Sequence, residues 1–218
     1  DVCSSDLLDP NRPMSWRLRH SQSGGGVFAD LGSHLVDLVL YILGGVRAVR
    51  AQTRTFISER PVTKGSPERE RVDVDDWALC TLELLSGATG VIEVTRMAAG
   101  ASQESGFEIY GSRGALIYRE SNPDSAFYYS LQKGEWLSGL GRLPAPSGER
   151  PIEQIYPTSK YSQGMMTNAH LAAEADLLLN IAENKPSTNN FRSAARVQQV
   201  VEAVYLSAKA GGEIYKLE

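Results

Sequence analysis

A run of three glycines followed by an apolar repeat most constrains how this chain can fold. Gly24-Gly25-Gly26 predicts a flexible joint, and from Val27 onward apolar residues recur at the three- and four-residue spacing of an amphipathic helix. The apolar stripe consists of Leu31, Leu35, Leu38 and Ile42. Gly44-Gly45 then predicts that the helix ends in a left-handed cap. We therefore expect a helix to enter the core directly behind a hinge.

The same helix carries a second, polar face. Asp30 and His34 are four residues apart, so a helix places them on one side, where they can approach each other. Asp37 and Tyr41 continue this face. A carboxylate beside an imidazole favours the charged ring and fixes its orientation, which suits a histidine that takes and returns a proton near neutral pH.

Two features decide what this polar face could bind. The preceding glycines would let a substrate or cofactor approach the backbone, and would leave the first-turn amides free to meet its oxygen atoms. No third His, Cys or carboxylate is spaced as a ligand near Asp30 and His34, so we expect no metal site. The alternative is that Asp30 is a solvated first-turn carboxylate and His34 a surface residue.

Strand patterns fill the middle of the chain, and helical patterns fill its last third. Strands are expected at residues 46–57, 77–85, 90–96, 107–110, 115–118, 126–132 and 213–217, and helices at 168–183 and 191–210. Residues 12–19 are expected to be extended, with Trp16 and Leu18 on one face, and the charged segment 58–74 to be a mobile loop. This order predicts an α+β fold with one open sheet and helices packed on it. An uncovered sheet face could pair with a second copy.

Composition and charge exclude several classes of partner. The 218 residues carry a net charge of -4 without a long basic run, so we expect neither nucleic acid nor a membrane surface as partner. The longest apolar run, near Leu35–Leu43, contains Asp37 and is too short to span a bilayer. Cys3 and Cys80 do not form a disulfide framework, and Cys80 is expected to be a small core residue. We therefore expect a reducing, cytoplasmic setting.

Several motifs together resemble one known family. Trp16-Arg17 is followed by Ser-Gly-Gly-Gly and by Asp-Leu-Gly-Ser-His-Leu-Val-Asp-Leu from Asp30 onward, and later come Val74-Asp75-Asp76 and the segment Phe107–Gly114. This pattern resembles the C-terminal domain of the Gfo/Idh/MocA family, which includes glucose–fructose oxidoreductase and inositol dehydrogenase. The resemblance covers nearly all of residues 12–218, and its Gly-Gly-Gly…Asp-x-x-x-His element is fairly specific. It implies an open mixed, mostly antiparallel β-sheet with helices packed on one face.

The resemblance also implies roles for individual residues. His34 would be the acid/base histidine that exchanges a proton with the substrate hydroxyl during hydride transfer, and Asp30 the aspartate that binds or polarises the substrate. Trp16 and Arg17 would match a segment that lines the substrate pocket. His170 could face the same pocket, or could be a surface residue at a helix start. The implied partners are a small-molecule sugar or polyol and a second copy of the chain, bound through the open sheet face.

The family's nucleotide-binding motifs, Gly-x-Gly-x-x-Gly and Glu-Lys-Pro, are not found in this sequence. Gly24-x-Gly26-x-x-Ala29 fits a loose dinucleotide pattern, but no apolar strand precedes it. Asn184-Lys185-Pro186 lies at a predicted helix end, where Lys-Pro is common. NAD or NADP would therefore be bound mainly by a Rossmann domain outside this sequence, and this chain alone would be inactive.

Residues 1–7 resemble the translation of a common sequencing adapter, and we expect no fold or function from them. Residues 8–218 would then form one substrate-binding and dimerisation domain. Three functions stay open at this point. The chain could be the substrate-binding half of an NAD(P)-dependent dehydrogenase acting on a sugar or cyclic polyol, part of an NAD-dependent glycosidase of the same family, or a non-enzymatic sugar-sensing or dimerisation module.

Overall fold

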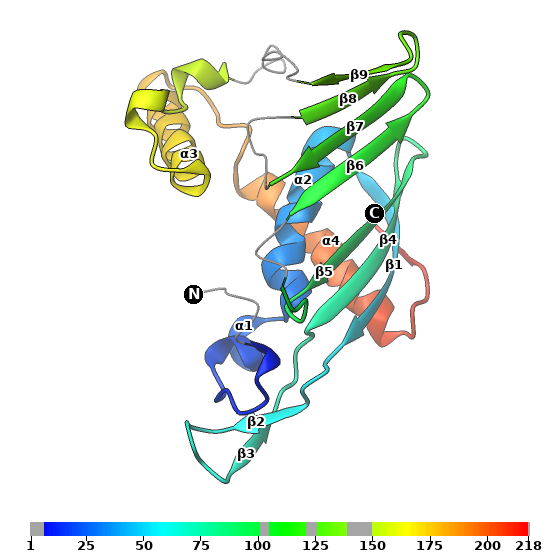
Figure 1. Cartoon of the computed structure of the whole chain (residues 1–218), viewed down its shortest axis with the longest axis vertical. Coiled ribbons are helices and arrows are strands. Elements are labelled where there is room, and N and C mark those ends of the chain that lie inside the picture. The colour runs from blue at the N-terminus through cyan, green and yellow to red at the C-terminus, as the bar shows by residue number, and fades with distance from the viewer. Residues whose placement is uncertain (1–6, 101–104, 121–125, 139–149, 218) are drawn as a thin grey trace. The chain divides into compact units, whose positions relative to one another are not determined.

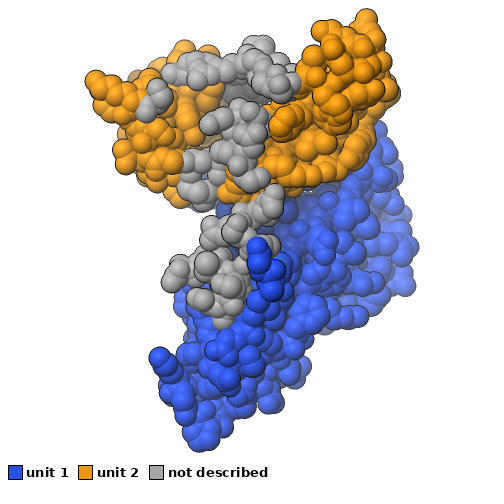
Figure 2. All heavy atoms as spheres, in the orientation of Figure 1, with its two compact units in different colours: residues 1–102, 191–218 blue, residues 103–190 orange. Residues whose placement is uncertain are grey.

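The computed structural model describes residues 7–100, 105–120, 126–138 and 150–217. Two compact units make up the chain, as Figure 2 shows by colour. The first unit combines residues 1–102 with residues 191–218, and the second unit consists of residues 103–190.

The first unit contains an antiparallel sheet of four strands (Figure 1). In spatial order its strands are β10 (Tyr215–Lys216), β1 (Val46–Arg54), β4 (Trp77–Leu84) and β5 (Thr89–Thr95). Helix α4 (Phe191–Lys209) packs on β1, and helix α2 (Ser33–Leu43) packs on α4. The core is apolar because alternate strand residues meet the valines of α4. Polar residues and one valine alternate with them and are exposed: Arg50, Gln52, Thr81, Val91 and Glu93.

Helix α2 is preceded by one π-helical turn, Phe28–Gly32, which we call the π-turn. Leu31 and Leu35 pack against the core as the repeat predicts, but Ile42 is 41% exposed. The buried side of α2 instead continues through Val36, Val39 and Leu40. Gly44 ends the helix with φ 88° and ψ -163°, so the predicted left-handed cap is wrong in its ψ angle while the positive φ still requires glycine.

A two-stranded ribbon replaces the mobile loop expected at residues 58–74. Its strands are β2 (Glu59–Pro61) and β3 (Arg69–Arg71). The ribbon is held by a double hydrogen bond in which Arg19 Nε and Nη2 each donate to the Glu70 carboxylate at 2.6 Å. It also shares a small buried cluster with the preceding segment, made of Met14, Leu18, Val72 and Val74. The loop prediction failed because these contacts join segments about fifty residues apart.

The segment before the glycines is helical rather than extended. Trp16–Leu18 forms a 3-10 turn, and α1 (His20–Ser23) follows. Leu18 is buried whereas Trp16 is 53% exposed, so these two side chains do not share a face. The residues upstream of this segment are held by the fully buried Arg60 of β2, which donates hydrogen bonds to the carbonyl of Leu7 at 2.6 Å and to that of Asp9 at 2.7 Å. Residues 1–6 lie outside the described residues, and the adapter interpretation stays a prediction.

The second unit has its own antiparallel sheet and one long helix. In spatial order its strands are β6 (Gly106–Gly111), β7 (Gly114–Arg119), β8 (Ala126–Ser130) and β9 (Glu135–Ser138). Helix α3 (Met165–Ala182) carries Asp176 and Asn180, and Glu183 follows its last residue. All three accept hydrogen bonds from the Arg150 side chain. The α+β class with antiparallel sheet is confirmed. The described strands, however, form two four-stranded sheets and a ribbon instead of one sheet.

The helical stretch His20–Leu43 is long and apolar enough to cross a membrane by length and composition alone, with a mean hydropathy of 1.5. Gly24 interrupts this stretch in the left-handed conformation, with φ 75°. Val27, Phe28 and Val36 are fully buried in the core of the first unit. A core helix passes the same test of length and composition, so the stretch does not by itself indicate a membrane segment.

Candidate functional site

The four consecutive backbone amides of residues 26–29 donate hydrogen bonds to two residues, Asp75 and Tyr205. Asp75 accepts from the Gly26 amide through Oδ1 at 3.0 Å and from the Phe28 amide through Oδ2 at 2.9 Å. Its main-chain carbonyl accepts from the Val27 amide at 2.9 Å. The Tyr205 hydroxyl accepts from the Gly26 and Ala29 amides, each at 3.0 Å. Burial and the neighbouring Asp75 carboxylate raise the pKa of Tyr205, so its hydroxyl stays protonated and donates to Asp75 Oδ1 at 2.8 Å. We call this arrangement the Asp75–Tyr205 hub.

The hub explains why glycines precede the π-turn. A Cβ atom at Gly26 would lie 2.2 Å from the Asp75 carbonyl oxygen, and one at Gly25 would lie 2.7 Å from the Tyr205 hydroxyl. The glycines therefore admit groups of the chain itself. The expectation that these amides are free to meet a substrate or cofactor is wrong, because Asp75 and Tyr205 bind them. The loose dinucleotide pattern that begins at Gly24 has no free amides at residues 26–29 for a pyrophosphate.

Asp30 lies on the π-turn and forms an ion pair with Arg96, the residue that follows β5. One guanidinium nitrogen of Arg96 donates to Asp30 Oδ2. The Arg96 side chain is only 5% exposed, whereas the Asp30 side chain is 41% exposed. The carboxylate therefore joins a buried cation to the protein surface. No hydrogen bond or ion pair links the described side chains of Asp30 and His34, so the predicted influence of Asp30 on His34 stays a prediction.

His34 is exposed in the first turn of α2 and is not part of the apolar core. Trp16 and Arg17 are also exposed, and the Arg17 guanidinium carbon lies 4.6 Å from the centre of the Trp16 ring. His170 is exposed on α3 and belongs to the second unit. The roles of these residues in catalysis and substrate binding stay predictions. Within the described ranges, no three His, Cys, Asp or Glu side chains gather as a metal site would require.

Cys80 is fully buried on β4, which confirms its predicted place in the core. Burial raises the pKa of this thiol to about 12, so the reactive thiolate is not formed near neutral pH.

Three residues that organise the site were not predicted as such from the sequence. Asp75 stands out in the sequence only as part of a motif, Tyr205 lies 130 residues from Asp75, and Arg96 lies 66 residues from Asp30. No local spacing links such partners. The Val74-Asp75-Asp76 segment is the sequence signal that could have indicated Asp75, because aspartate is unfavourable in strands and two aspartates directly precede one here.

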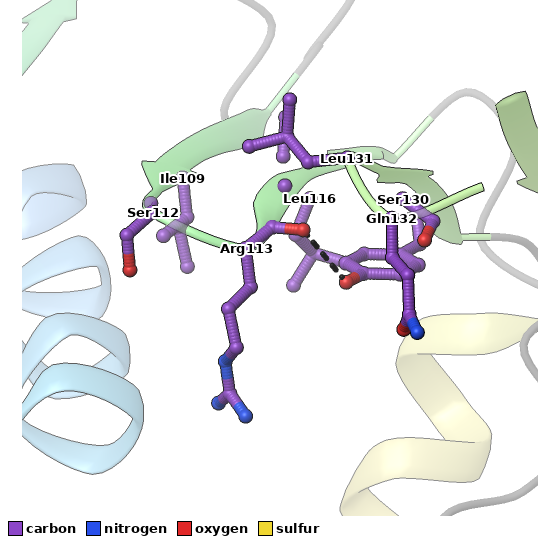
Figure 3. Close-up of a pocket in the computed structure, with 11 residues that line it drawn as sticks. Ile109, Ser112, Arg113, Leu116, Ser130, Leu131 and Gln132 are labelled. Carbon is purple, nitrogen blue, oxygen red and sulfur yellow. Dashed lines mark hydrogen bonds between the residues drawn. The ribbon is translucent and has the colours of Figure 1, made fainter. Parts of the chain in front are cut away.

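A hollow of about 670 Å³ lies in the second unit, at the turn between β6 and β7 (Figure 3). The Arg113 carbonyl accepts hydrogen bonds from the Tyr128 hydroxyl at 3.2 Å and from the Leu131 amide at 3.1 Å. Figure 3 shows the Arg113 guanidinium extending away from these bonds. The main chain of Arg113 thus joins the hairpin to the next strand. Asp30 and His34 belong to the other unit.

Comparisons with known proteins agree on one family. The model of the GFO/IDH/MocA C-terminal domain matches residues 2–117. Levoglucosan dehydrogenase of Pseudarthrobacter phenanthrenivorans is 34% identical over 217 residues, covering 92% of this chain and 54% of that protein. The chain therefore spans about half the length of this curated relative.

Solved structures show the same correspondence. Levoglucosan dehydrogenase in complex with NADH and L-sorbose matches 97% of this chain and 55% of its own length, with a TM-score of 0.81 and 25% identity. An oxidoreductase domain protein from Kribbella flavida matches 97% of this chain and 56% of its own length, with a TM-score of 0.83 and 29% identity. Because the family model alone covers just over half of the chain, this protein belongs to the Gfo/Idh/MocA family.

Proposed function

We propose that this chain is the substrate-binding part of an NAD(P)-dependent oxidoreductase that acts on a sugar or cyclic polyol. The observation that carries the proposal is an exposed imidazole, His34, one helical turn beyond a carboxylate, Asp30, which a buried arginine holds in place. Support comes from the relatives, since levoglucosan dehydrogenase has been solved with NADH and levoglucosan at a TM-score of 0.80 and 26% identity.

In this proposal the side chains of His34 and Asp30 have different roles. His34 accepts the proton of the substrate hydroxyl that becomes a carbonyl group, as a general base does. Asp30 uses Oδ2 for Arg96, and Oδ1 has no hydrogen-bond partner in the described part of the chain, so Oδ1 can accept a hydrogen bond from a substrate hydroxyl. The bound nicotinamide would supply the acceptor for the hydride.

Trp16 and Arg17 offer a surface of the kind that sugars bind. An exposed aromatic ring can pack against the apolar face of a sugar, and a guanidinium can donate to its hydroxyl groups. Trp16 is 53% exposed, and the Arg17 guanidinium lies over its ring. Both residues therefore remain our candidates for substrate binding, and the role of His170 in the second unit stays a separate prediction.

The cofactor itself would be held mainly outside this chain. The glycine segment that could mimic a phosphate loop has its amides bound to the hub, so it does not fit a pyrophosphate. We therefore propose that residues 7–217 supply the substrate and proton-transfer side of the site. The 218-residue chain alone should show no dehydrogenase turnover, and detectable turnover would contradict this division.

The test replaces His34 by alanine in the full-length enzyme. Formation of NADH or NADPH is followed by absorbance with levoglucosan, L-sorbose and myo-inositol as substrates. Loss of the general base should lower turnover by about 10²–10⁴-fold. His20→Ala is the matched control, because His20 is exposed on α1 and its backbone amide, not its ring, makes the hydrogen bond to Asp73. A His34→Ala enzyme with unchanged turnover would refute the proposal.

The same assay separates the two alternatives. A glycosidase that recycles its cofactor would consume a glycoside without accumulating reduced nicotinamide. A sugar-sensing or dimerisation module would bind sugar without turnover. Association of copies through the uncovered sheet face and a cytoplasmic setting stay predictions.

A further inference from the structure

Arg96 occupies a position that is unfavourable for an unpaired cation. Its side chain is 5% exposed, and its backbone amide donates to the Asp76 carbonyl at 3.0 Å, which fixes the residue at the end of β5. Removing the partner of a buried charge is strongly destabilising, so such a guanidinium needs its carboxylate. That carboxylate is Asp30, which is also the predicted substrate ligand.

Asp30 is held from its backbone as well as from its side chain. Its amide donates to the Gly26 carbonyl at 3.1 Å, and the Gly26 amide is bound by both members of the Asp75–Tyr205 hub. The π-turn that carries Asp30 also contacts β5, the strand that leads into Arg96. Asp30 is therefore held through both its backbone and its side chain, and one oxygen atom of its carboxylate is bound to Arg96.

We propose that Arg96 is a positioning residue, which engages one oxygen of Asp30 so that the other is presented to a substrate hydroxyl and not to His34. This inference rests on the proposed function. A planar guanidinium suits the task because it fixes the direction of its hydrogen bonds, whereas a lysine ammonium acts as a compact, rotating charge. Asp30 then serves substrate binding, while His34 serves proton transfer.

The experiment compares Arg96→Met, Arg96→Lys, Asp30→Asn and the double variant Arg96→Met/Asp30→Asn in the full-length enzyme. The substrate is whichever of levoglucosan, L-sorbose and myo-inositol the enzyme oxidises. KM should rise by about 10- to 100-fold in each single variant, the worth of a hydrogen bond to a charged group, while kcat changes by less than about threefold. The double variant should be no worse than Asp30→Asn alone, because Arg96 acts only through Asp30.

Arg47→Met is the matched control. Arg47 pairs with Glu83 at 3.1 Å in an exposed ion pair on the sheet of the same unit, so this substitution removes an arginine without touching the site. KM and kcat should keep their original values. If Arg96→Met does not fold, Arg96→Lys decides the question, since it retains the charge but loses the planar fork and should still raise KM at least about tenfold.

Equilibrium binding gives a readout that does not depend on turnover. In the His34→Ala enzyme loaded with NADH, Arg96→Met should raise the dissociation constant of the same sugar, measured by calorimetry, by about 10- to 100-fold. The role of Arg96 would be refuted, with the proposed function left standing, by unchanged KM and unchanged binding in both Arg96 variants. It would also be refuted if the effects of Arg96→Met and Asp30→Asn on KM multiply in the double variant. An active His34→Ala enzyme would instead refute the proposed function.

Discussion

Replacing Tyr205 by phenylalanine tests whether the hub holds the π-turn in place. The substitution removes one hydroxyl and keeps the ring. The edge-to-face packing of this ring on Phe28, with 6.3 Å between the ring centres, therefore remains. The Gly26 amide keeps its bond to Asp75 at 3.0 Å, but the Ala29 amide loses the oxygen that it contacts at 3.0 Å. Asp75 Oδ1 also loses its donor at 2.8 Å.

The magnitude follows from these two losses. A buried amide without a partner costs about 1–3 kcal/mol, and a hydrogen bond to a charged group contributes about 1.5–3 kcal/mol. Because Tyr205 is only partly buried and water can replace some of these contacts, we expect the free energy of unfolding to fall by about 2–4 kcal/mol. This is a large fraction of the about 5–15 kcal/mol that stabilises a typical domain.

The assay is urea unfolding of the 218-residue chain, followed by circular dichroism. The midpoint should fall while the slope with denaturant stays constant, which identifies a change in stability alone. Tyr215→Phe is the control, because Tyr215 is 41% exposed on β10 and its substitution should change stability by less than about 0.5 kcal/mol. A Tyr205→Phe protein as stable as this control would show that the Tyr205 hydroxyl contributes nothing to the stability of the fold.

Three further substitutions or titrations follow from the structure. Gly26→Ala places a Cβ atom 2.2 Å from a carbonyl oxygen and should cost more than about 3 kcal/mol in the same urea assay, whereas Gly90→Ala, which meets open space, should cost less than about 1 kcal/mol; equal effects would contradict the reasoning. In a Cys3→Ser variant, the Cys80 thiol, whose pKa burial raises to about 12, should resist a disulfide reagent in the folded protein and react in concentrated guanidinium. Hydrogen bonds from an arginine and a lysine lower the pKa of Glu183 to about 2, so its contribution to stability is complete above its unfolded pKa of about 4.3 and disappears as the pH falls towards 2; a carbon-detected NMR titration with a midpoint near 4.3 would refute this.

Local patterns predicted those elements that are stabilised by neighbours in sequence. The hairpins of the two sheets follow from alternating apolar residues around glycine-containing turns, as at Ser86–Thr89 and Gly111–Gly114. The β2–β3 ribbon was missed because its charged sequence resembles a solvated loop. It is held by Arg19, which pairs with Glu70 across 51 residues of sequence.

The site shows the same division between local and distant information. The spacing of Asp30 and His34 placed both on one helical segment, and the structure agrees. The sequence also shows the glycines before them, but it does not show their reason, because Asp75 and Tyr205 approach from elsewhere in the chain. The partner of Asp30 could not be predicted, since nothing near it in sequence points to a cation at the end of β5.

The first unit is discontinuous in sequence, and this has a consequence for synthesis on the ribosome. Residues 1–102 are translated before residues 103–190, yet α4 and β10 lie within residues 191–218 and complete the core and the sheet last. Until those residues emerge, the inner face of β1 has no helix to cover it, and Asp75 lacks its phenolic partner. The nascent first unit must therefore wait while the whole second unit is translated, which makes this interval the stage at which a chaperone would be needed.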